Sequence, residues 1–307
     1  MKIVFFGTPD NVIPVLNVLH KTFSSVDGSC IKAVVTQPPQ PTGRQKINTF
    51  SAVDNWAYKK SIPRLYTPQD VLREKVPADI AILAAYGAII PNDVINYFPY
   101  GILNVHPSLL PKLRGASPVQ STLTIGEDCG VTIIKLDEKM DHGPIVTQFK
   151  DTLEENDTLA TLRVRLFEKS AEVIKTLLPA YIKGKVNLKP QDHELATFTR
   201  LIKRDDGFVD WKFLKSAITG EPTDYVWDIP YIKNYQIKPT PINIDRFVRA
   251  LTPWPGAWTK LEIGKTGKRL KILEVKAHND NLEIITVQLE GKNPVSWKQF
   301  LEVYKVV

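Results

Sequence analysis

The chain contains 307 residues, of which 43% are hydrophobic and 24% are charged, and its formal net charge is +7 at pH 7. A chain of this length can form two domains of ordinary size, each with a hydrophobic core of its own. No apolar run approaches the roughly 18 residues that a membrane-spanning helix needs, so the sequence excludes a membrane-spanning protein. The positive charge is compatible with a polyanionic partner but does not require one.

The first residues, MKIVFFGTPD, are expected to form the first strand of a fold and not a targeting segment. They hold one lysine and a short apolar run, without a small-residue cleavage site or an Arg-rich presequence. Cys30 and Cys129 are the two cysteines of the sequence, and they form no Cys-x-x-Cys motif. We therefore expect no disulfide framework and predict a protein of the reducing cytoplasm.

Short apolar runs alternate with amphipathic stretches over the first half of the chain. The apolar runs predict strands at residues 2–7, 31–37, 79–87 and 101–108. The stretches between them predict helices at residues 11–23, 52–61 and 92–98. Continuously apolar strands separated by helices indicate a parallel sheet covered on both faces. We predict an α/β fold, namely a doubly wound, mostly parallel sheet.

Two further strands are expected within residues 130–153, on either side of an acidic turn. A long amphipathic helix is predicted next, with Asp157 and Thr158 as candidate caps at its start and Gly184 at its end. This helix is expected to close the first domain.

The sequence pattern changes from about residue 189 onward. Short strand-like runs follow, interrupted by Pro, Gly and Asn-Asp turns, and this part of the chain is the more basic per residue. We predict a small β-barrel here. The predicted organisation is a first, catalytic domain over residues 1–188, a linker over 189–204 and a second domain over 205–307.

Asn104 and His106 stand at the end of a predicted strand, in the sequence NVHPSLLP. In open α/β sheets, ligands bind outside the carboxyl ends of the strands. Residues two apart in an extended segment point the same way, so the amide and the imidazole are expected to converge on one small volume. For either residue alone, a capping role or a hydrogen-bonded place in the core is the alternative.

Asp141 is the candidate third member of this site, because its acidic turn follows a strand expected to lie beside the strand of Asn104. A carboxylate beside an imidazole fixes the tautomer of the ring and stabilises the imidazolium. Asp137, Glu138 and His142 lie in the same turn and compete for this role on sequence grounds alone.

Three other kinds of site are poorly supported. A metal site is disfavoured because no second histidine lies near His106 in sequence and no ligand triad has suitable spacing. Ser108 lies in no Gly-x-Ser-x-Gly elbow, so nucleophilic serine chemistry is not indicated. The segment GTPDNVIP lacks Gly-x-Gly-x-x-Gly spacing, which disfavours a nicotinamide enzyme.

An Asn, His and Asp set suits direct transfer of an acyl group to an amine. The amide of Asn104 can donate to the oxyanion of a tetrahedral intermediate, and such a donor is typically worth about 2.7 to 4 kcal/mol. His106 can take or relay the amine proton, which typically contributes about 10² to 10⁴ in rate. Asp141 would orient His106 and, through water, could help protonate the leaving nitrogen.

Six motifs extend this pattern along the chain: VFFGTPD at 4–10, TQPPQPTGR at 36–44, AAYGAIIP at 84–91, NVHPSLLPKLRGASPVQ at 104–120, GVTIIKLDEKMDHG at 130–143 and TPWPGAW at 252–258. With these motifs the chain resembles the methionyl-tRNA formyltransferases. The resemblance implies a Rossmann-like catalytic domain followed by an OB-like domain that binds tRNA. It also implies transfer of the formyl group of 10-formyltetrahydrofolate to the α-amine of methionyl initiator tRNA, for translation initiation.

The resemblance further implies roles for individual residues. Asn104, His106 and Asp141 would be catalytic. The implied folate-binding residues are Tyr86, Gly87, Ala88, Ile89, Ile90, Pro91, Ser108, Leu109, Leu110, Pro111, Glu138, Lys139 and Met140. We expect the enzyme to act as a monomer, with the folate as its cosubstrate and without a metal.

The acceptor amine is a separate question, because relatives in the superfamily also formylate glycinamide ribonucleotide and amino sugars of nucleotides. The loop TQPPQPTGRQK resembles the loop that enters the acceptor end of the tRNA in tRNA formyltransferases. It shows no apolar anchor, so we expect it to be mobile until RNA binds, and an ordinary exposed loop is the alternative. The candidate phosphate contacts are Arg44, Lys46, Lys203, Arg204, Arg246, Arg249, Lys265, Lys268, Arg269 and Lys271.

Two rival functions keep the fold but change the activity: formylation of an amino-sugar nucleotide, and RNA binding without catalysis. The sequence also departs from the family in its second half. Residues 217–241 are an aromatic-rich insertion, and a strand pair is missing after residue 280. We expect a shortened, modified barrel, with the insertion covering its open edge, and RNA stacking on the insertion as the alternative.

Overall fold

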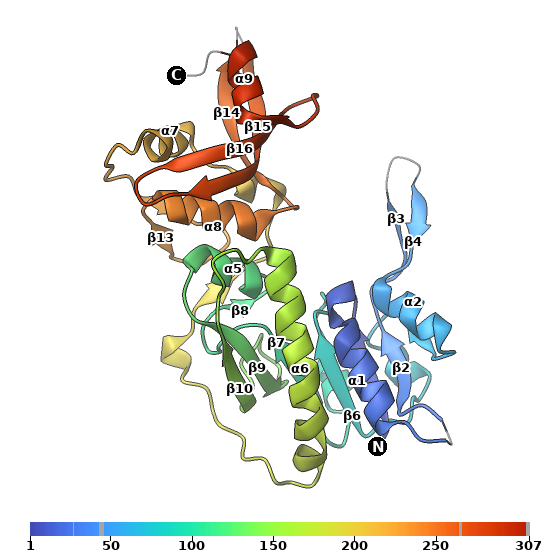
Figure 1. Ribbon diagram of the computed structural model, residues 1–307. Helices are drawn as coiled ribbons and strands as arrows, with labels where there is room; N and C mark the ends of the chain where they lie inside the picture. The colour runs from blue at the N-terminus through green and yellow to red at the C-terminus, as the bar shows by residue number, and fades with distance from the viewer. Residues whose placement is uncertain (27, 43–45, 264–265, 305–307) are drawn as a thin grey trace. The chain divides into compact units, whose positions relative to one another are not determined.

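The computed structural model describes residues 1–26, 28–42, 46–263 and 266–304. The chain forms two compact units, and Figure 1 labels many of their elements. Unit 1 consists of Met1–Arg114, Cys129–Thr152 and Arg163–Ala196, and unit 2 consists of Gly115–Asp128, Leu153–Leu162 and Thr197–Val307. Within the described residues, no helix is both long enough and apolar enough to cross a membrane.

Unit 1 is built on a seven-stranded sheet with the strand order β10-β9-β7-β6-β1-β2-β5. These strands are β1 (Ile3–Gly7), β2 (Ile31–Val35), β5 (Arg64–Leu65), β6 (Ile80–Ala84), β7 (Ile102–His106), β9 (Cys129–Lys135) and β10 (Ile145–Asp151). The five strands from β7 to β5 run parallel. The first strand lies between β2 and β6, so the strand order reverses there, as in doubly wound sheets. The predicted mostly parallel α/β sheet is therefore confirmed.

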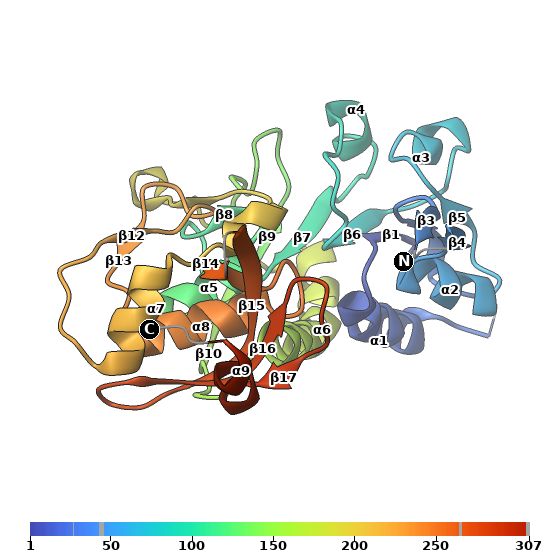
Figure 2. The same cartoon turned by 90° about the horizontal axis from the view of Figure 1, so that it is seen from above.

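Helices cover both faces of this sheet. They are α1 (Ile13–Phe23), α2 (Ala52–Lys59), α3 (Asp70–Arg73), α4 (Asn92–Ile95) and α6 (Leu159–Ile182). Figure 2 shows α3 and α4 on one side of the strands and α1 on the other side. Val4 and Phe6 of β1 share a buried cluster with Val71 of α3 and Val94 of α4. Burial on both faces explains why the central strands are apolar at nearly every position.

The long helix α6 begins one residue after its predicted caps. The hydroxyl of Thr158 accepts a hydrogen bond from the backbone N–H of Thr161 at 3.2 Å, and a carboxylate oxygen of Asp157 accepts one from the Thr161 hydroxyl at 2.9 Å. The first of these bonds satisfies a backbone N–H of the first turn that has no partner within the helix. Gly184 follows the last turn with a φ of 66°, the left-handed conformation common after helix ends.

The last two strands of the sheet are antiparallel, and this sets the path of the acidic turn. β9 runs antiparallel to β7, with Ile134 opposite Asn104, and β10 pairs back on β9. Residues 136–144 therefore start beside the beginning of β7, where the N–H of Leu136 donates to the carbonyl of Ile102 at 2.8 Å. To reach the end of β7, this turn runs back along the strand.

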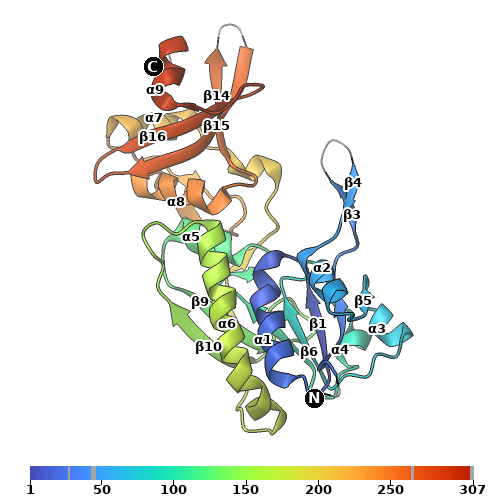
Figure 3. The same ribbon diagram turned by 45° about the vertical axis from the view of Figure 1, so that its right-hand side comes forward.

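The proline-rich loop after β2 contains a short hairpin. Its strands are β3 (Gln40–Thr42) and β4 (Ile47–Thr49), and Gln40 pairs with Thr49. The apolar side chains of Ile47 and Phe50 are exposed, so neither of them anchors the hairpin by packing into a core. Figure 3 shows the hairpin projecting from the rest of unit 1. Arg44 lies outside the described residues.

Unit 2 holds a four-stranded antiparallel sheet with the order β14-β15-β16-β17. Its elements are α5 (Pro118–Ile125), α7 (Trp211–Thr219), α8 (Pro241–Leu251), α9 (Trp297–Val303), β12 (Trp227–Asp228), β13 (Gln236–Ile237), β14 (Ala257–Ile263), β15 (Thr266–Ala277), β16 (Leu282–Leu289) and β17 (Val295–Ser296). Two further short strands of the chain are β8 (Arg114–Gly115) and β11 (Phe198–Thr199). A small β-barrel was predicted after the α/β sheet, and the structure shows a smaller antiparallel sheet there.

The aromatic-rich insertion contributes buried aromatic rings to the core of unit 2. Its strands β12 and β13 pair with each other and not with the four-stranded sheet. Trp227 is 5% exposed and Tyr231 is fully buried, and their ring centroids lie 4.5 and 6.2 Å from that of Phe247 in α8. The insertion was expected to cover the open edge of the sheet. Instead, its Trp227 and Tyr231 rings pack against α8. This burial leaves neither ring available for stacking on RNA bases.

Candidate active site

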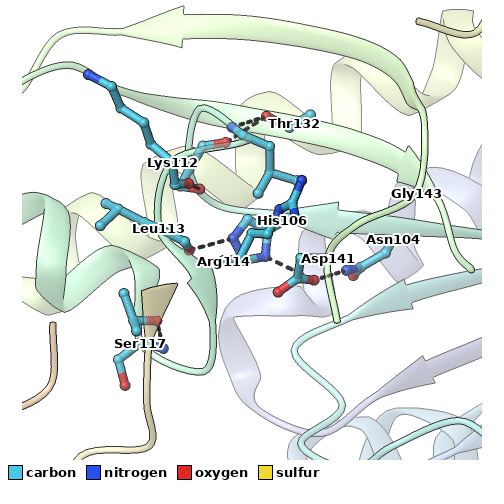
Figure 4. A network of polar contacts seen from close by, with 12 residues as sticks. Asn104, His106, Lys112, Leu113, Arg114, Ser117, Thr132, Asp141 and Gly143 are labelled. Atoms are coloured by element: carbon cyan, nitrogen blue, oxygen red, sulfur yellow. Dashed lines mark hydrogen bonds and ion pairs between the residues drawn. The ribbon is translucent and has the colours of Figure 1, made fainter. Parts of the chain in front are cut away.

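Asn104 and His106 lie on the same face of β7, as the two-residue periodicity of a strand requires. Figure 4 shows both side chains directed toward Asp141. Asn104 is 6% exposed, His106 is 4% exposed and Asp141 is 8% exposed. The structure therefore brings together the three side chains that the sequence singled out, whereas their catalytic roles remain predictions.

One carboxylate oxygen of Asp141 lies between the amide and the imidazole. The Nδ2 atom of Asn104 donates to Oδ1 of Asp141 at 3.1 Å, and Nδ1 of His106 lies 3.5 Å from the same oxygen. Asp141 has a φ of 48°, a left-handed conformation that a non-glycine residue adopts only when its surroundings hold it there. The turn is thus held in a disfavoured conformation that aims this carboxylate at β7.

The opposite side of the His106 ring contacts the main chain. Nε2 of His106 lies 3.0 Å from the carbonyl oxygen of Leu113. A carbonyl oxygen only accepts, so Nε2 carries a proton in this arrangement. The other nitrogen, Nδ1, faces the carboxylate of Asp141, which also only accepts when it is ionised. A proton released during a reaction can therefore be held between Nδ1 and the Asp141 carboxylate.

The turn after β7 is fixed by a buried hydroxyl. Thr132 of β9 is fully buried, and its Oγ1 donates to the carbonyl of Ser108 at 2.7 Å and accepts from the N–H of Leu110 at 2.9 Å. Nε2 of Gln148 in β10 donates to the carbonyl of Leu110 at 2.9 Å. These bonds hold the turn that leads to Leu113, and hence the carbonyl that contacts His106.

The three rivals of Asp141 have other positions in the acidic turn. Nδ1 of His142 lies 2.7 Å from Oδ2 of Asp137, so these two residues pair with each other. Glu138 is exposed. Among the four candidates, Asp141 is the one whose carboxylate contacts the polar side chains of β7 in the described part of the chain.

The segment from Tyr86 to Pro91 follows β6, the strand beside β7, at the carboxyl edge of the sheet. The Tyr86 side chain is 2% exposed and packs edge-on against Phe6, and burial raises the pKa of its phenol to about 12. Only the main chain of Tyr86 is therefore suited to contact a ligand. Gly87 has a φ of 86°, and no atom lies within 4 Å of the place where a side chain would start.

The other implied folate-binding residues differ in exposure. Ile89 is 84% exposed and Met140 is 63% exposed, which is unusual for such apolar side chains. The exposed members are Gly87, Ala88, Glu138 and Lys139, the half-buried members are Pro91, Leu109 and Pro111, and the buried members are Ile90, Ser108 and Leu110. Exposed apolar side chains in both segments are compatible with a flat ring system, but the folate contacts stay predictions.

Some basic residues expected to bind tRNA have intramolecular partners. Arg249 pairs with Asp245 at 2.7 Å and donates to the carbonyl of Asp157. The guanidinium of Arg269 lies 3.6 Å from the ring centroid of Trp258. Lys46, Lys203, Arg204 and Lys268 are exposed, Arg246 and Lys271 are half-buried, and Arg44 and Lys265 lie outside the described residues. The exposed side chains are the ones with charge available to a phosphate.

Several residues that support the site were missed from the sequence. Thr132 is a polar residue in the otherwise apolar run GVTIIK, which is a signal for a buried hydrogen bond. Gln148 and Gln191 carry no such signal, because a glutamine in a polar segment looks like an ordinary surface residue. The Leu113 contact uses a main-chain carbonyl, which residue identity does not reveal.

No group of three or more His, Cys, Asp or Glu side chains in the described part of the chain is arranged to hold a metal ion. A doubly wound sheet with an amide, an imidazole and a carboxylate meeting beside one central strand has the groups for acyl transfer to an amine. Residues 1–178 match the family described as formyl transferase, and residues 238–283 match the formyl transferase C-terminal domain. The chain belongs to the formyl transferase family, which confirms the class predicted from the motifs.

Individual relatives agree with this membership. The methionyl-tRNA formyltransferase of Bacillus cereus is 32% identical over 331 residues, covering 98% of this chain and 95% of the relative. The solved methionyl-tRNA formyltransferase from Clostridium thermocellum is 16% identical with a TM-score of 0.55, covering 94% of this chain and 98% of that one. The N-formyltransferase from Helicobacter canadensis, solved with folinic acid and dTDP-3-aminofucose, is 16% identical with a TM-score of 0.61, covering 91% and 88%. The two solved structures support the fold.

Proposed function

We propose that this protein transfers the formyl group of 10-formyltetrahydrofolate to the α-amino group of methionyl initiator tRNA in the cytoplasm. The observation that carries the proposal is the convergence of Asn104 and His106 on one carboxylate oxygen of Asp141. The methionyl-tRNA acceptor is supported by relatives of that name that align over nearly the whole of both chains.

The residues near the carboxyl edge of β6 fit a folate donor. Gly87 leaves open space beside the main chain, and Ile89 and Met140 offer exposed apolar surface. A flat pterin ring is commonly held by main-chain groups on its edge and apolar side chains on its faces. When bound, the donor supplies a formyl group already activated on nitrogen.

The side chains of this protein supply orientation and proton handling. One N–H of the Asn104 amide is used on Asp141, and its second N–H can donate to the formyl oxygen as negative charge develops there. The pair formed by His106 and Asp141 can take the proton that the attacking amine loses, because Nδ1 faces the carboxylate. A protonated pair can then return a proton to the leaving nitrogen.

Contacts with the tRNA phosphates are assigned to the exposed lysines and arginines of the hairpin and of unit 2. Lys46 is exposed on the hairpin, and Lys203, Arg204 and Lys268 are exposed on unit 2. Arg44→Ala is expected to slow the tRNA reaction without changing folate binding. A tRNA reaction that is unchanged by Arg44→Ala would remove the hairpin loop from the proposed interface.

The deciding experiment offers purified protein one folate donor and two acceptors, methionyl initiator tRNA and a nucleotide-linked amino sugar. We expect formyl-methionyl-tRNA and no formylated sugar. Formylated sugar alone would assign the enzyme to that second class of acceptor, which the Helicobacter canadensis relative binds. Binding of tRNA without transfer to either acceptor would overturn the catalytic proposal.

Catalytic variants make this assay specific for the proposed site. Asn104→Ala, His106→Ala and Asp141→Ala are each expected to lower turnover by about 10² to 10³, the effect typical of losing one group of a preorganised site. His278→Ala is the matched control, because His278 is an exposed histidine of unit 2 that contacts Glu283. Activity close to wild type in any of the first three variants would contradict the assigned roles.

A further inference from the structure

The turn that carries Asp141 is held by a second segment, residues 191–193. Nε2 of Gln191 donates to the carbonyl oxygens of Asp141 and Gly143, at 2.8 and 2.7 Å. The ring of His193 stacks on the ring of His142, with 3.9 Å between centroids and 8° between planes. The carbonyls on either side of His142, and the ring of His142 itself, are thus held by the same short segment.

Arg114 fixes the orientation of the Gln191 amide. Its Nη2 and Nε atoms donate to Oε1 of Gln191 at 2.6 and 3.2 Å, and Nη2 lies 2.8 Å from Nδ1 of His193. A guanidinium only donates and a carbonyl only accepts, so the Gln191 oxygen must face Arg114 and its nitrogen must face the turn. Arg114 and Gln191 are 4% and 6% exposed, so these bonds are shielded from water.

These contacts connect the residue that faces Nε2 of His106 to the residue that faces Nδ1 of the same ring. Leu113, whose carbonyl contacts Nε2 of His106, is the neighbour of Arg114 in the chain. Gln191 connects Arg114 to the main chain of Asp141, whose carboxylate faces Nδ1 of the same ring. The distance between the imidazole and the carboxylate is therefore set by a continuous path of short hydrogen bonds.

The backbone of Asp141 needs such support. Its φ of 48° lies in the left-handed region, which is less favourable than the right-handed region for a residue with a side chain. Gly143 adds a steric reason, because a side chain there would start 1.9 Å from the carbonyl oxygen of Lys135. The glycine lets the turn approach β9 closely, and Gln191 then holds the carbonyls on either side of His142.

We propose that Gln191 is a positioning residue of formyl transfer, which keeps the Asp141 carboxylate in reach of Asn104 and His106 while Arg114 keeps its amide in the required orientation. This inference rests on the proposed function, since it assigns Gln191 an effect only through Asp141. Gln191 itself contacts main-chain atoms and Arg114, and it is given no contact with a substrate.

The first test replaces Gln191 by residues of similar length that lack the N–H donors. Gln191→Met and Gln191→Glu are expected to lower kcat by about 10- to 100-fold, the usual effect of removing a group that orients a functional side chain. The KM values for folate and tRNA should stay at the wild-type level. Glu194→Gln is the matched control, because Glu194 is exposed in the same segment. An unchanged kcat would overturn the proposal, whether or not KM is raised.

A double-mutant cycle separates positioning from a general loss of structure. If Gln191 acts through the Asp141 carboxylate, Gln191→Met should cost little further activity in an Asp141→Asn background. The same fold loss in both backgrounds would show that Gln191 acts independently of Asp141, which contradicts the proposal. Thermal unfolding of all four proteins shows whether each one is folded at the assay temperature.

A spectroscopic measurement tests the effect of Gln191 on the His106 ring without any substrate. The chain has five histidines, so the ring signals of ¹⁵N-labelled protein can be assigned individually. Gln191→Met should shift the ring resonances of His106 but leave those of His20 and His278 unchanged. Unshifted His106 signals would overturn the proposal even in an active enzyme. Wild-type protein that transfers no formyl group would instead refute the proposed function, so the two failures are distinguishable.

Discussion

The carbonyl oxygen of Leu113 lies 3.0 Å from Nε2 of His106, and because a carbonyl only accepts, a hydrogen bond here requires a proton on Nε2. The other ring nitrogen is left to face Asp141. The imidazole is therefore held by main chain on one side and is available for proton exchange on the other side. This asymmetry follows from a backbone group, so it does not depend on the identity of residue 113.

The first prediction concerns this tautomer. Because a carbonyl only accepts, we expect Nε2 to be the protonated nitrogen of the neutral His106 ring. Nitrogen NMR of labelled protein distinguishes a protonated from an unprotonated ring nitrogen directly. The exposed His278 serves as the reference signal. An unprotonated Nε2 in a neutral His106 ring would show that the Leu113 contact is not a hydrogen bond in solution.

The second prediction concerns the amide nitrogen of Asn104. Asn104→Asp replaces the amide nitrogen that donates to Asp141 at 3.1 Å with an oxygen, so two carboxylates would face each other. We expect turnover to fall by about 10² to 10³, because the donor to the reacting carbonyl is lost as well. Single-turnover formyl transfer measures this loss. Asn55→Asp, on the exposed face of α2, should leave turnover unchanged.

The third prediction concerns the support of the turn after β7. Thr132→Val keeps the shape of a fully buried side chain but removes the hydroxyl that bonds Ser108 and Leu110. Buried main-chain groups that lose a partner typically cost about 1–3 kcal/mol. We expect the free energy of unfolding in urea to fall by that amount. The exposed Thr152 provides the control variant Thr152→Val, which should change the unfolding free energy little.

The fourth prediction concerns acid sensitivity. The pKa of His193 lies below its ordinary value of 6.5, because desolvation, the neighbouring His142 and the positive charge of Arg114 disfavour the protonated ring, while Asp137 opposes this shift. Between pH 6.5 and the lowered value, the unfolded chain binds more protons than the folded one, so stability rises with pH in that window. The contribution is complete above pH 6.5 and is lost as the pH falls through the lowered value.

This acid sensitivity is measured by urea unfolding above and below pH 6.5. Wild-type protein should lose more unfolding free energy on acidification than His193→Asn, whose side chain does not titrate. Lys139 also faces this histidine pair and is kept constant in both proteins. An equal loss in both proteins would assign the acid sensitivity to other groups.

The fifth prediction concerns the aromatic insertion. Trp227 is 5% exposed against Phe247, so Trp227→Ala should destabilise unit 2 by about 3–5 kcal/mol, as large-to-small changes of buried aromatic residues do. Val226 is 56% exposed, and Val226→Ala should be nearly neutral. Urea unfolding followed by tryptophan fluorescence measures both variants. A stable Trp227→Ala protein would show that the insertion is not part of the core in solution.

Much of the sheet was predictable because its central strands are buried on both faces. The runs that contain β1, β2 and β6 are apolar at nearly every position, and such runs mark strands without reference to any partner. Asn104 and His106 could also be paired from sequence, since a strand has a period of two. What periodicity leaves undetermined is the direction of the neighbouring strand, and β9 proved antiparallel to β7.

The choice of Asp141 over its neighbours could not be derived from residue types alone. Asp137 and Asp141 are chemically equal, and only the path of the turn back along β7 separates them. The contribution of Gln191 was less visible still, because it lies 50 positions from Asp141 and acts on main-chain carbonyls. Contacts between side chains and distant main chain leave no repeating pattern in a sequence.

The position of Gln191 in the chain has a consequence for protein engineering. Unit 1 continues to Ala196, eight residues beyond the end of the first domain expected from sequence. In a chimaera joined at residue 188, residue 191 would come from the parent chosen for RNA recognition, whereas Asp141 would come from the other parent. The two residues would then not be matched to each other. Chimaeras of this protein should therefore be joined after residue 196, so that Asp141 and Gln191 come from the same parent.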